Sequence, residues 1–244
     1  NRTQSLKFFE KIGGLRKILV LNQAPRNIDP SARELASTGL TLADVRMLSE
    51  EGTYFDFVDP AAGGDFLVQR GNVSRQEEIQ GVSPSLALVY ELTVAEGRFI
   101  TDRDVATAAR VVVLGDTAAR RLFGGESALG EIVNIEGQGF QVVGVLRRKE
   151  HRFGGGSGGN ALEWMNQWTL VPITTVTQRL KGDPLGRLDF VNVMAKTAED
   201  ADKAAAETER LLLKAHGGVR DFRIINRKER MEQMQAQMQA FNVT

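Results

Sequence analysis

Cysteine is absent from the sequence, histidine occurs only twice, and the charges balance. The absence of cysteine excludes disulfide bonds and thiolate metal sites, but it fits a reducing or an oxidising compartment equally well. Lys plus Arg and Asp plus Glu each number 31, so the net charge is zero. A nucleic-acid-binding protein should carry a basic excess or a basic stripe, so we predict no nucleic-acid partner.

Long hydrophobic runs are also absent. No stretch reaches the ~18 apolar residues that a membrane-spanning helix needs, and the first residues do not form a signal peptide. Apolar residues nevertheless make up 42% of the chain and charged residues 25%, which is the composition of a globular protein with a real core. Taken alone, these features indicate a cytoplasmic protein of one large or two small domains.

The motifs of common catalytic and cofactor sites are missing as well. Residues 154–159 are rich in glycine, but Asn160 follows where a P-loop requires lysine. No Gly-x-Ser-x-Gly motif is present. His151 and His216 lie far apart in the sequence, and the place of His216 at the end of a helical pattern is explained by the helix dipole. We therefore predict no catalytic residue, no cofactor and no metal ion.

The clearest local signals lie in residues 96–146. They predict, in order, a short helix begun by a capping box of Thr101 and Asp104, a buried strand, a helix capped by Asp116, and a β-hairpin. The strands are expected at residues 110–114, 131–135 and 140–146.

This stretch resembles the periplasmic core domain of MacB-type, FtsX-like ABC transporter permeases. The resemblance is carried by GRFITDRD at residues 97–104, by VVVLGDTAARRLFGGESALGEIVNI at 111–135 and by FQVVGVL at 140–146. Similarity continues at residues 153–155, 170–176 and 178–180. Together these segments cover roughly residues 17–226.

Outside this stretch, the sequence predicts alternating strands, helices and loops. A capping box of Thr41 and Asp44 begins a helix that ends at Gly52, and Thr197 with Asp200 begins another. Further helices are expected at residues 5–12, 83–92, 172–181 and 227–241. Further strands are expected at residues 17–21, 54–58, 65–69, 74–81, 169–171, 187–194 and 221–226, with a loop at 59–64.

These elements predict an α+β fold in two modules. Residues 13–82 and 185–226 are expected to share one sheet with helices on one face, and residues 83–184 to form a second α+β module inserted into the first. The resemblance implies that the first module is porter-like and membrane-proximal, and that the insert is distal. It also implies that residues 1–12 and 227–244 are stalk helices leading to membrane spans beyond both ends.

Two sets of apolar residues are candidate contact surfaces. Phe153, Trp164 and Trp168 surround the glycine-rich loop, where they either pack beneath it or offer a surface to a partner. A narrow stripe at helical spacing follows residues 227–241 and can pair with a stripe in the first 12 residues as a two-helix seam. The members of this seam are Leu6, Phe9, Ile12, Met231, Met234, Met238 and Phe241. The alternative is a surface helix without a mate.

The resemblance implies a non-enzymatic domain on the periplasmic face of the bacterial inner membrane, which transmits ATP-driven motion for the export of a substrate. It further implies an ABC nucleotide-binding subunit, a second permease subunit in a dimer and, in some members, a periplasmic adaptor and an outer-membrane channel. The chain has no Walker A motif, so any ATPase would lie outside it. The alternative is a sensor or scaffold that controls cell-wall enzymes without transport. A soluble hydrolase would need a buried ionisable cluster, for which we find no candidate.

Overall fold

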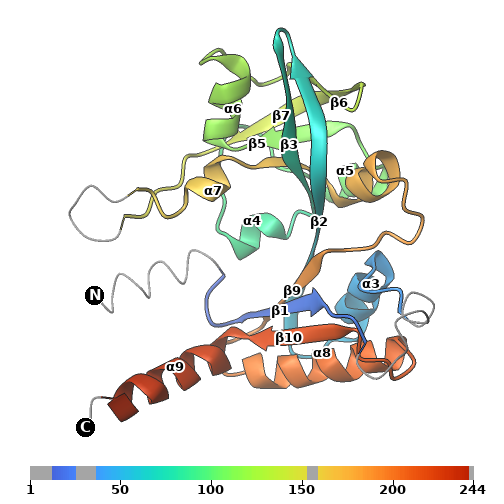
Figure 1. Ribbon diagram of the computed structural model, residues 1–244, viewed down its shortest axis with the longest axis vertical. Coiled ribbons are helices and arrows are strands. Elements are labelled where there is room, and N and C mark those ends of the chain that lie inside the picture. The colour runs from blue at the N-terminus through green and yellow to red at the C-terminus, as the bar shows by residue number, and fades with distance from the viewer. Residues whose placement is uncertain (1–12, 26–36, 153–158, 242–244) are drawn as a thin grey trace. The chain divides into compact units, whose positions relative to one another are not determined.

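The structure is a computed structural model that describes residues 13–25, 37–152 and 159–241. It divides the chain into two compact units (Figure 1). Unit 1 contains Ala61–Pro184, and unit 2 contains Phe9–Pro60 together with Leu185–Thr244. Both units combine helices and strands, so the predicted α+β class is confirmed.

The first boundary between the units falls earlier in the chain than the sequence analysis placed it. We expected the insert to begin at residue 83, whereas unit 1 begins at Ala61. The reason is that β2 (Phe55–Arg70) and β3 (Val73–Val82) pair as one antiparallel ribbon from residue 62 onwards, which holds both strands in the same unit. The second boundary, after Pro184, lies where it was expected.

Unit 2 is built on an antiparallel sheet with the strand order β10-β1-β9, continued by β2. The central strand is β1, in which Ile18 lies opposite Asn226 of β10 on one side and opposite Val193 of β9 on the other. The three strands are β1 (Lys17–Asn22), β9 (Phe190–Ala195) and β10 (Phe222–Asn226).

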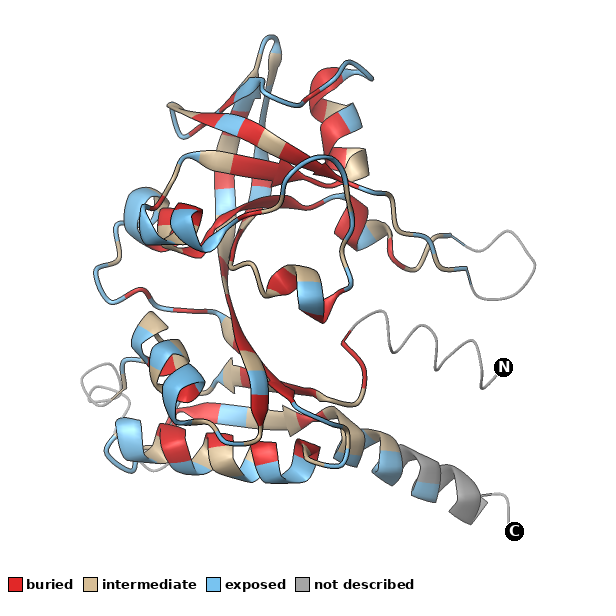
Figure 2. Cartoon of the chain, turned by 180° about the vertical axis from the view of Figure 1, so that it is seen from behind, coloured by how far each residue is buried: buried red, intermediate tan, exposed pale blue. Residues whose placement is uncertain are grey.

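Three helices belong to unit 2: α3 (Leu42–Glu51), α8 (Ala201–Ala215) and α9 (Arg227–Phe241). The capping box of Thr41 and Asp44 is present at the start of α3, as predicted. One face of α8 is buried through Ala204, Thr208 and Leu211 while the opposite face is exposed, which gives the alternating colours of this helix in Figure 2. The predicted bounds of α9 are confirmed, and this helix begins directly after β10.

In unit 1 the strand pairings close into a ring. The order β2-β3-β8-β5-β7 is closed by β6, which pairs with both β7 and β2, and β4 pairs with the end of β7. The strands are β4 (Val94–Gly97), β5 (Val111–Leu114), β6 (Ile132–Ile135), β7 (Gln138–Leu146) and β8 (Thr169–Pro172). The residues that face inward, among them Val112, Phe140 and Leu170, are fully buried or nearly so.

The helices of unit 1 are short. They are α4 (Leu86–Val89), α5 (Asp102–Ala106), α6 (Asp116–Phe123), α7 (Glu163–Asn166) and a π-helical segment, η1 (Thr175–Leu180). The capping box of Thr101 and Asp104 at α5 is confirmed. The predicted hairpin is confirmed too: Ile135 pairs with Gln138 across a two-residue turn whose φ angles are both positive, 48° and 74°.

Several predicted elements differ from those in the structure. Residues 59–64 are not a loop but part of the continuous strand β2, because pairing partners on both sides keep the chain extended through Pro60. The helix expected at 83–92 ends at Val89, since Glu91 adopts a positive φ of 48° and the chain turns into β4, which was not predicted. Gly115, rather than Asp116, is the N-cap of α6.

The helix expected at residues 172–181 also differs in kind. Its regular part is the π-helix η1, in which the N–H of Lys181 bonds the carbonyl of Val176, five residues back. The helix expected at residues 5–12 and the stripe on it lie outside the described residues.

Candidate functional surfaces

The clearest surface feature of unit 1 is a cluster of three aromatic rings. Tyr90, Trp164 and Trp168 contact one another edge to face, with ring centroids 5.1–5.8 Å apart. Trp168 is buried at 7% exposure, whereas Trp164 remains 43% exposed. Leu88, two residues before Tyr90, is 65% exposed. The cluster is therefore a buried aromatic base with one indole ring that remains accessible.

A polar network beneath the rings fixes the orientation of α7. The carboxylate of Glu163, next to Trp164, accepts hydrogen bonds from four side chains. The donors are the hydroxyl of Thr117 at 2.6 Å, Nη2 of Arg148 at 2.7 Å, and Nδ2 of Asn160 and of Asn166 at 3.1 Å each. Burial opposes the ionisation of Glu163, but these hydrogen bonds outweigh it and lower its pKa to about 2. Glu163 is thus a fixed anion that positions Trp164, not a proton donor.

The same network closes the base of the glycine-rich loop. Nδ2 of Asn160 donates to the carbonyl of Lys149 at 2.7 Å, and the N–H of His151 donates to Oδ1 of Asn160 at 2.8 Å. The two ends of the loop are therefore tied together beside the aromatic cluster. Phe153, the third predicted contact residue, lies outside the described residues.

His216 belongs to a buried cluster in unit 2. Its Nδ1 lies 2.5 Å from Oδ1 of Asp221, and its Nε2 lies 3.2 Å from Oδ1 of Asp44. The hydrogen bond to Asp44 and then that to Asp221 raise the pKa of His216 to about 9 against the effect of burial. Ser37 donates to Asp221 at 2.5 Å and not to the imidazole. Because both ring nitrogens are engaged by carboxylates, this Ser, Asp and His arrangement cannot work as a catalytic triad.

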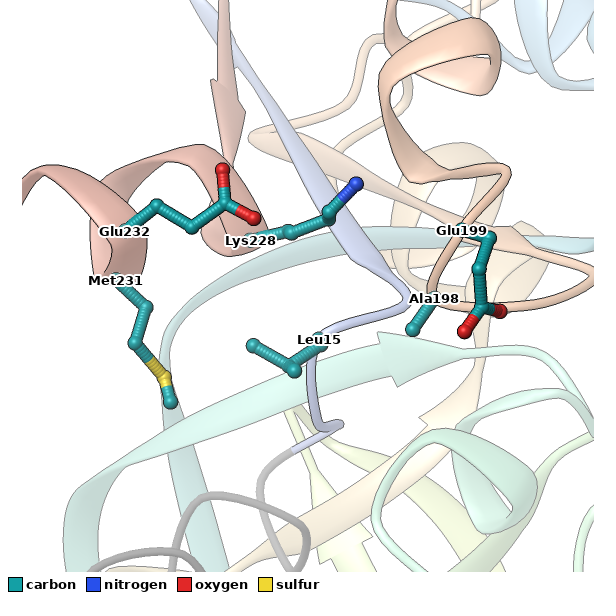
Figure 3. Close-up of a pocket in the computed structure, with 6 residues that line it drawn as sticks. All are labelled: Leu15, Ala198, Glu199, Lys228, Met231 and Glu232. Carbon is teal, nitrogen blue, oxygen red and sulfur yellow. The ribbon is translucent and has the colours of Figure 1, made fainter.

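A hollow of about 260 Å³ lies beside the first turns of α9 (Figure 3). It is lined by Leu15, Ala198, Glu199, Lys228, Met231 and Glu232. Met231 belongs to the predicted seam, and it lines the same hollow as Leu15, which precedes β1. Two chain segments that the sequence separates by more than two hundred residues therefore contribute apolar side chains to one space. The other predicted seam residues on α9 are Met234, Met238 and Phe241, whose side chains are outside the described residues, as are Leu6, Phe9 and Ile12.

Sequence reasoning missed Leu88, Tyr90 and the carboxylates around His216. The contact of Tyr90 with Trp164 and that of His216 with Asp44 join residues far apart in the chain. No local spacing signals such contacts.

Neither a metal centre nor a membrane span is found in the described part of the chain. Among the described residues, no group of three or more His, Asp or Glu side chains is placed to hold a metal ion. No helix in these ranges combines the length and the apolar character that crossing a bilayer requires.

Comparison with known proteins gives a family and two curated relatives. The model of the MacB-like periplasmic core domain matches residues 5–211. The macrolide export ATP-binding/permease protein MacB of Hahella chejuensis is 33% identical over 193 residues, which are 78% of this chain and 27% of that protein. The pyoverdine export ATP-binding/permease protein PvdT of Pseudomonas aeruginosa is 29% identical over 169 residues, 69% of this chain and 24% of that protein. The chain spans about a quarter of the length of these relatives.

Two solved structures share the fold. The periplasmic region of MacB from Actinobacillus actinomycetemcomitans superposes with a TM-score of 0.73 at 23% identity, covering 94% of this chain and 96% of that one. The extracellular domain of the noncanonic ABC-type transporter YknZ from Gram-positive bacteria superposes with a TM-score of 0.69 at 23% identity, covering 86% of this chain and 100% of that one.

Proposed function

The chain belongs to the MacB-like periplasmic core domain family, and from that premise we propose that it transmits ATP-driven motion across the membrane for the export of a substrate. It is the periplasmic part of an ABC transporter permease. ATP hydrolysis would take place outside these 244 residues, in another subunit or another segment of the same polypeptide. The curated relatives are named as ATP-binding/permease proteins for export, which supports this division of labour.

The junction of β10 with α9 carries the proposal. Asn226 is the last residue of β10, and its Oδ1 accepts from the N–H of Lys228 at 3.1 Å, so it also caps the helix. Asp202 of α8 accepts from Nδ2 of Asn226 at 2.7 Å and from Nζ of Lys228 at 2.8 Å. With no loop between strand and helix, and with both bound to α8, a displacement of α9 is passed directly to the sheet.

The terminal segments would form the stalk. We infer that unit 2 is membrane-proximal and unit 1 distal, because β1 and α9, the first and last described elements, both belong to unit 2. The seam would pair Leu6, Phe9 and Ile12 with the stripe of α9 that begins at Met231. The hollow that Met231 shares with Leu15 supports this pairing, since Ile12 lies only three residues before Leu15.

The partners would be an ABC nucleotide-binding subunit or segment, a second permease subunit in a dimer and, where present, a periplasmic adaptor and an outer-membrane channel. On this chain, the exposed ring of Trp164 over its buried aromatic base would be a contact point for such a protein. An exposed Trp on a rigid support is typical of residues that dominate binding energy in interfaces.

Cross-linking in the full-length transporter tests the proposal. The chain contains no cysteine, so an Ile12→Cys and Met231→Cys pair introduces the only thiols of this domain. Oxidation should form the disulfide readily and abolish export while ATP is still bound, and reduction should restore export. The matched control is Ile12→Cys with Arg210→Cys, which should leave export unchanged under oxidation. Arg210 is exposed on α8 and lies about two turns beyond Asp202, the residue that binds the start of α9.

The outcomes separate the two functions considered. Full export by the cross-linked protein would remove the mechanical role of the stalk. A full-length protein that exports no substrate, yet activates a cell-wall hydrolase in an ATP-dependent manner, would favour the sensor or scaffold function instead.

A further inference from the structure

Ionisable side chains are buried where β1, β2 and α9 meet in unit 2. Lys17 is 3% exposed, and Asp59 of β2 is 0% exposed. The β1–β10 register pairs Ile18 with Asn226, so the next position in the same register sets Lys17 opposite Arg227, the first residue of α9. Arg227 repels the ammonium group of Lys17, whereas Asp59 attracts it. Two cations thus compete for one buried carboxylate.

The other groups around this cluster carry no compensating charge. Asn192 of β9 is fully buried and donates Nδ2 to Oδ2 of Asp59 at 3.1 Å. Its Oδ1 has no hydrogen-bond partner among the described residues. β10 contributes the neutral Asn226, and on α8 the carboxylate of Asp202 is already bound by Asn226 and by the ammonium group that follows on α9. Asp59 is therefore the anion available to Lys17.

This imbalance makes the proton of Lys17 depend on the place of Arg227. Burial, followed by repulsion from Arg227, lowers the pKa of Lys17 to about 7 against the attraction of Asp59. The guanidinium of an arginine stays charged at every relevant pH. If Arg227 moves away, the repulsion is lost and the attraction of Asp59 remains, so Lys17 gains affinity for a proton from water.

We propose that Lys17 is a proton-linked latch between the sheet of unit 2 and α9: it is neutral while Arg227 lies beside it, and it takes up one proton when α9 carries Arg227 away. The inference rests on the proposed function, because it takes α9 as the moving element. Linkage is reciprocal, so acid favours the displaced position of α9 and alkali favours the seated one.

The proton affinity of Lys17 is measured by NMR on the whole 244-residue chain with labelled lysine side chains. The Lys17 signal is assigned by its loss in Lys17→Met, and it should titrate near pH 7. In Arg227→Gln the titration should shift upward by about one pH unit or more. Lys196→Met, which removes an exposed lysine just after β9, should leave it unchanged. A Lys17 midpoint near the ordinary lysine value, or one that Arg227→Gln does not move, would overturn the proposal.

The motion is measured by the distance between spin labels on α8 and α9. Because the chain has no cysteine, Ala206→Cys and Ala236→Cys give two unique and exposed attachment sites. The distance distribution should change between about pH 6 and about pH 8 and should become independent of pH in Lys17→Met. If Lys17→Met does not fold, Arg227→Gln should shift the same change to higher pH. A distribution that does not respond to pH in the parent chain would refute the latch.

Both measurements use the isolated chain and need neither ATP nor transport. An intact latch in a transporter whose export survives stalk cross-linking would refute the proposed function alone. A missing latch in a transporter that cross-linking stops would refute this inference alone.

Discussion

Raising the pH through about 9 should destabilise unit 2, and the cause would be His216. The imidazole is held between Asp44 and Asp221, and its side chain is only 7% exposed. The hydrogen bond to Asp44 is the largest cause that raises the pKa of His216, from 6.5 to about 9. The charged imidazolium therefore joins the start of α3, the end of α8 and the residue before β10.

The size and the sign of the effect follow from linkage. The pKa of His216 is higher in the folded than in the unfolded chain, so its stabilisation is fully present below about pH 6.5 and is lost as the pH rises through about 9. A rise of about 2.5 pKa units corresponds to about 3 kcal/mol in the free energy of unfolding. Lys17 acts with the opposite sign over part of this range, so the useful quantity is the difference between the parent chain and a His216 variant.

The assay is urea unfolding of the parent chain and of His216→Gln between about pH 6 and about pH 10. Both tryptophans, Trp164 and Trp168, lie in unit 1, so fluorescence reports unit 1 while circular dichroism also reports unit 2. The difference in free energy of unfolding, taken from circular dichroism, should be largest near pH 6 and should fall by about 3 kcal/mol by pH 10. His151→Gln, in unit 1, is the matched control and should show no such fall. A His216→Gln difference that stays constant across this pH range would refute the reasoning.

Three further predictions concern stability. The pKa of Lys17 is lower in the folded than in the unfolded chain, so the free energy of unfolding should rise between pH 7 and about 10.5 by as much as about 5 kcal/mol; a Lys17→Met variant that keeps this rise in urea titrations would contradict the assignment. Trp168→Ala should cost about 3–5 kcal/mol because Trp168 is 7% exposed, whereas Trp164→Ala, at 43% exposure, should cost about 1 kcal/mol in urea unfolding; the reverse order would show that the rings are assigned wrongly. Gly115→Ala should lower the melting temperature strongly, since its Cβ would collide with a backbone oxygen of α7, while Gly159→Ala meets open space and should be neutral; equal melting temperatures would contradict this close packing.

Local signals in the sequence were sufficient where both partners of an interaction lie within one turn. The capping boxes of Thr41 with Asp44 and of Thr101 with Asp104 each join residues three apart, so the starts of α3 and α5 could be predicted. The hairpin between β6 and β7 has the same character, because its two-residue turn needs positive φ angles at neighbouring positions.

Non-local pairing accounts for most of what the sequence did not reveal. Pro60 and the glycines at 63 and 64 are strand breakers by propensity, yet β2 runs through them because its neighbours in the sheet hold it extended. The candidate sites show the same limit more strongly. His216 and Asp44 are 172 positions apart, and no pattern within either segment predicts that they meet. The resemblance supplied the family, but it did not supply the supports of Trp164 or the buried cation of β1.

Asn226 serves as the last residue of a strand and as the cap of the helix that follows, and this dual use sets the rotational phase of α9. Each residue of an α-helix turns the chain by roughly 100°. A single insertion or deletion at the junction would rotate every side chain of α9 about its axis by that amount and aim its methionine stripe at a different neighbour. The length of this junction is therefore as much a determinant of which surface α9 presents as the identity of its side chains.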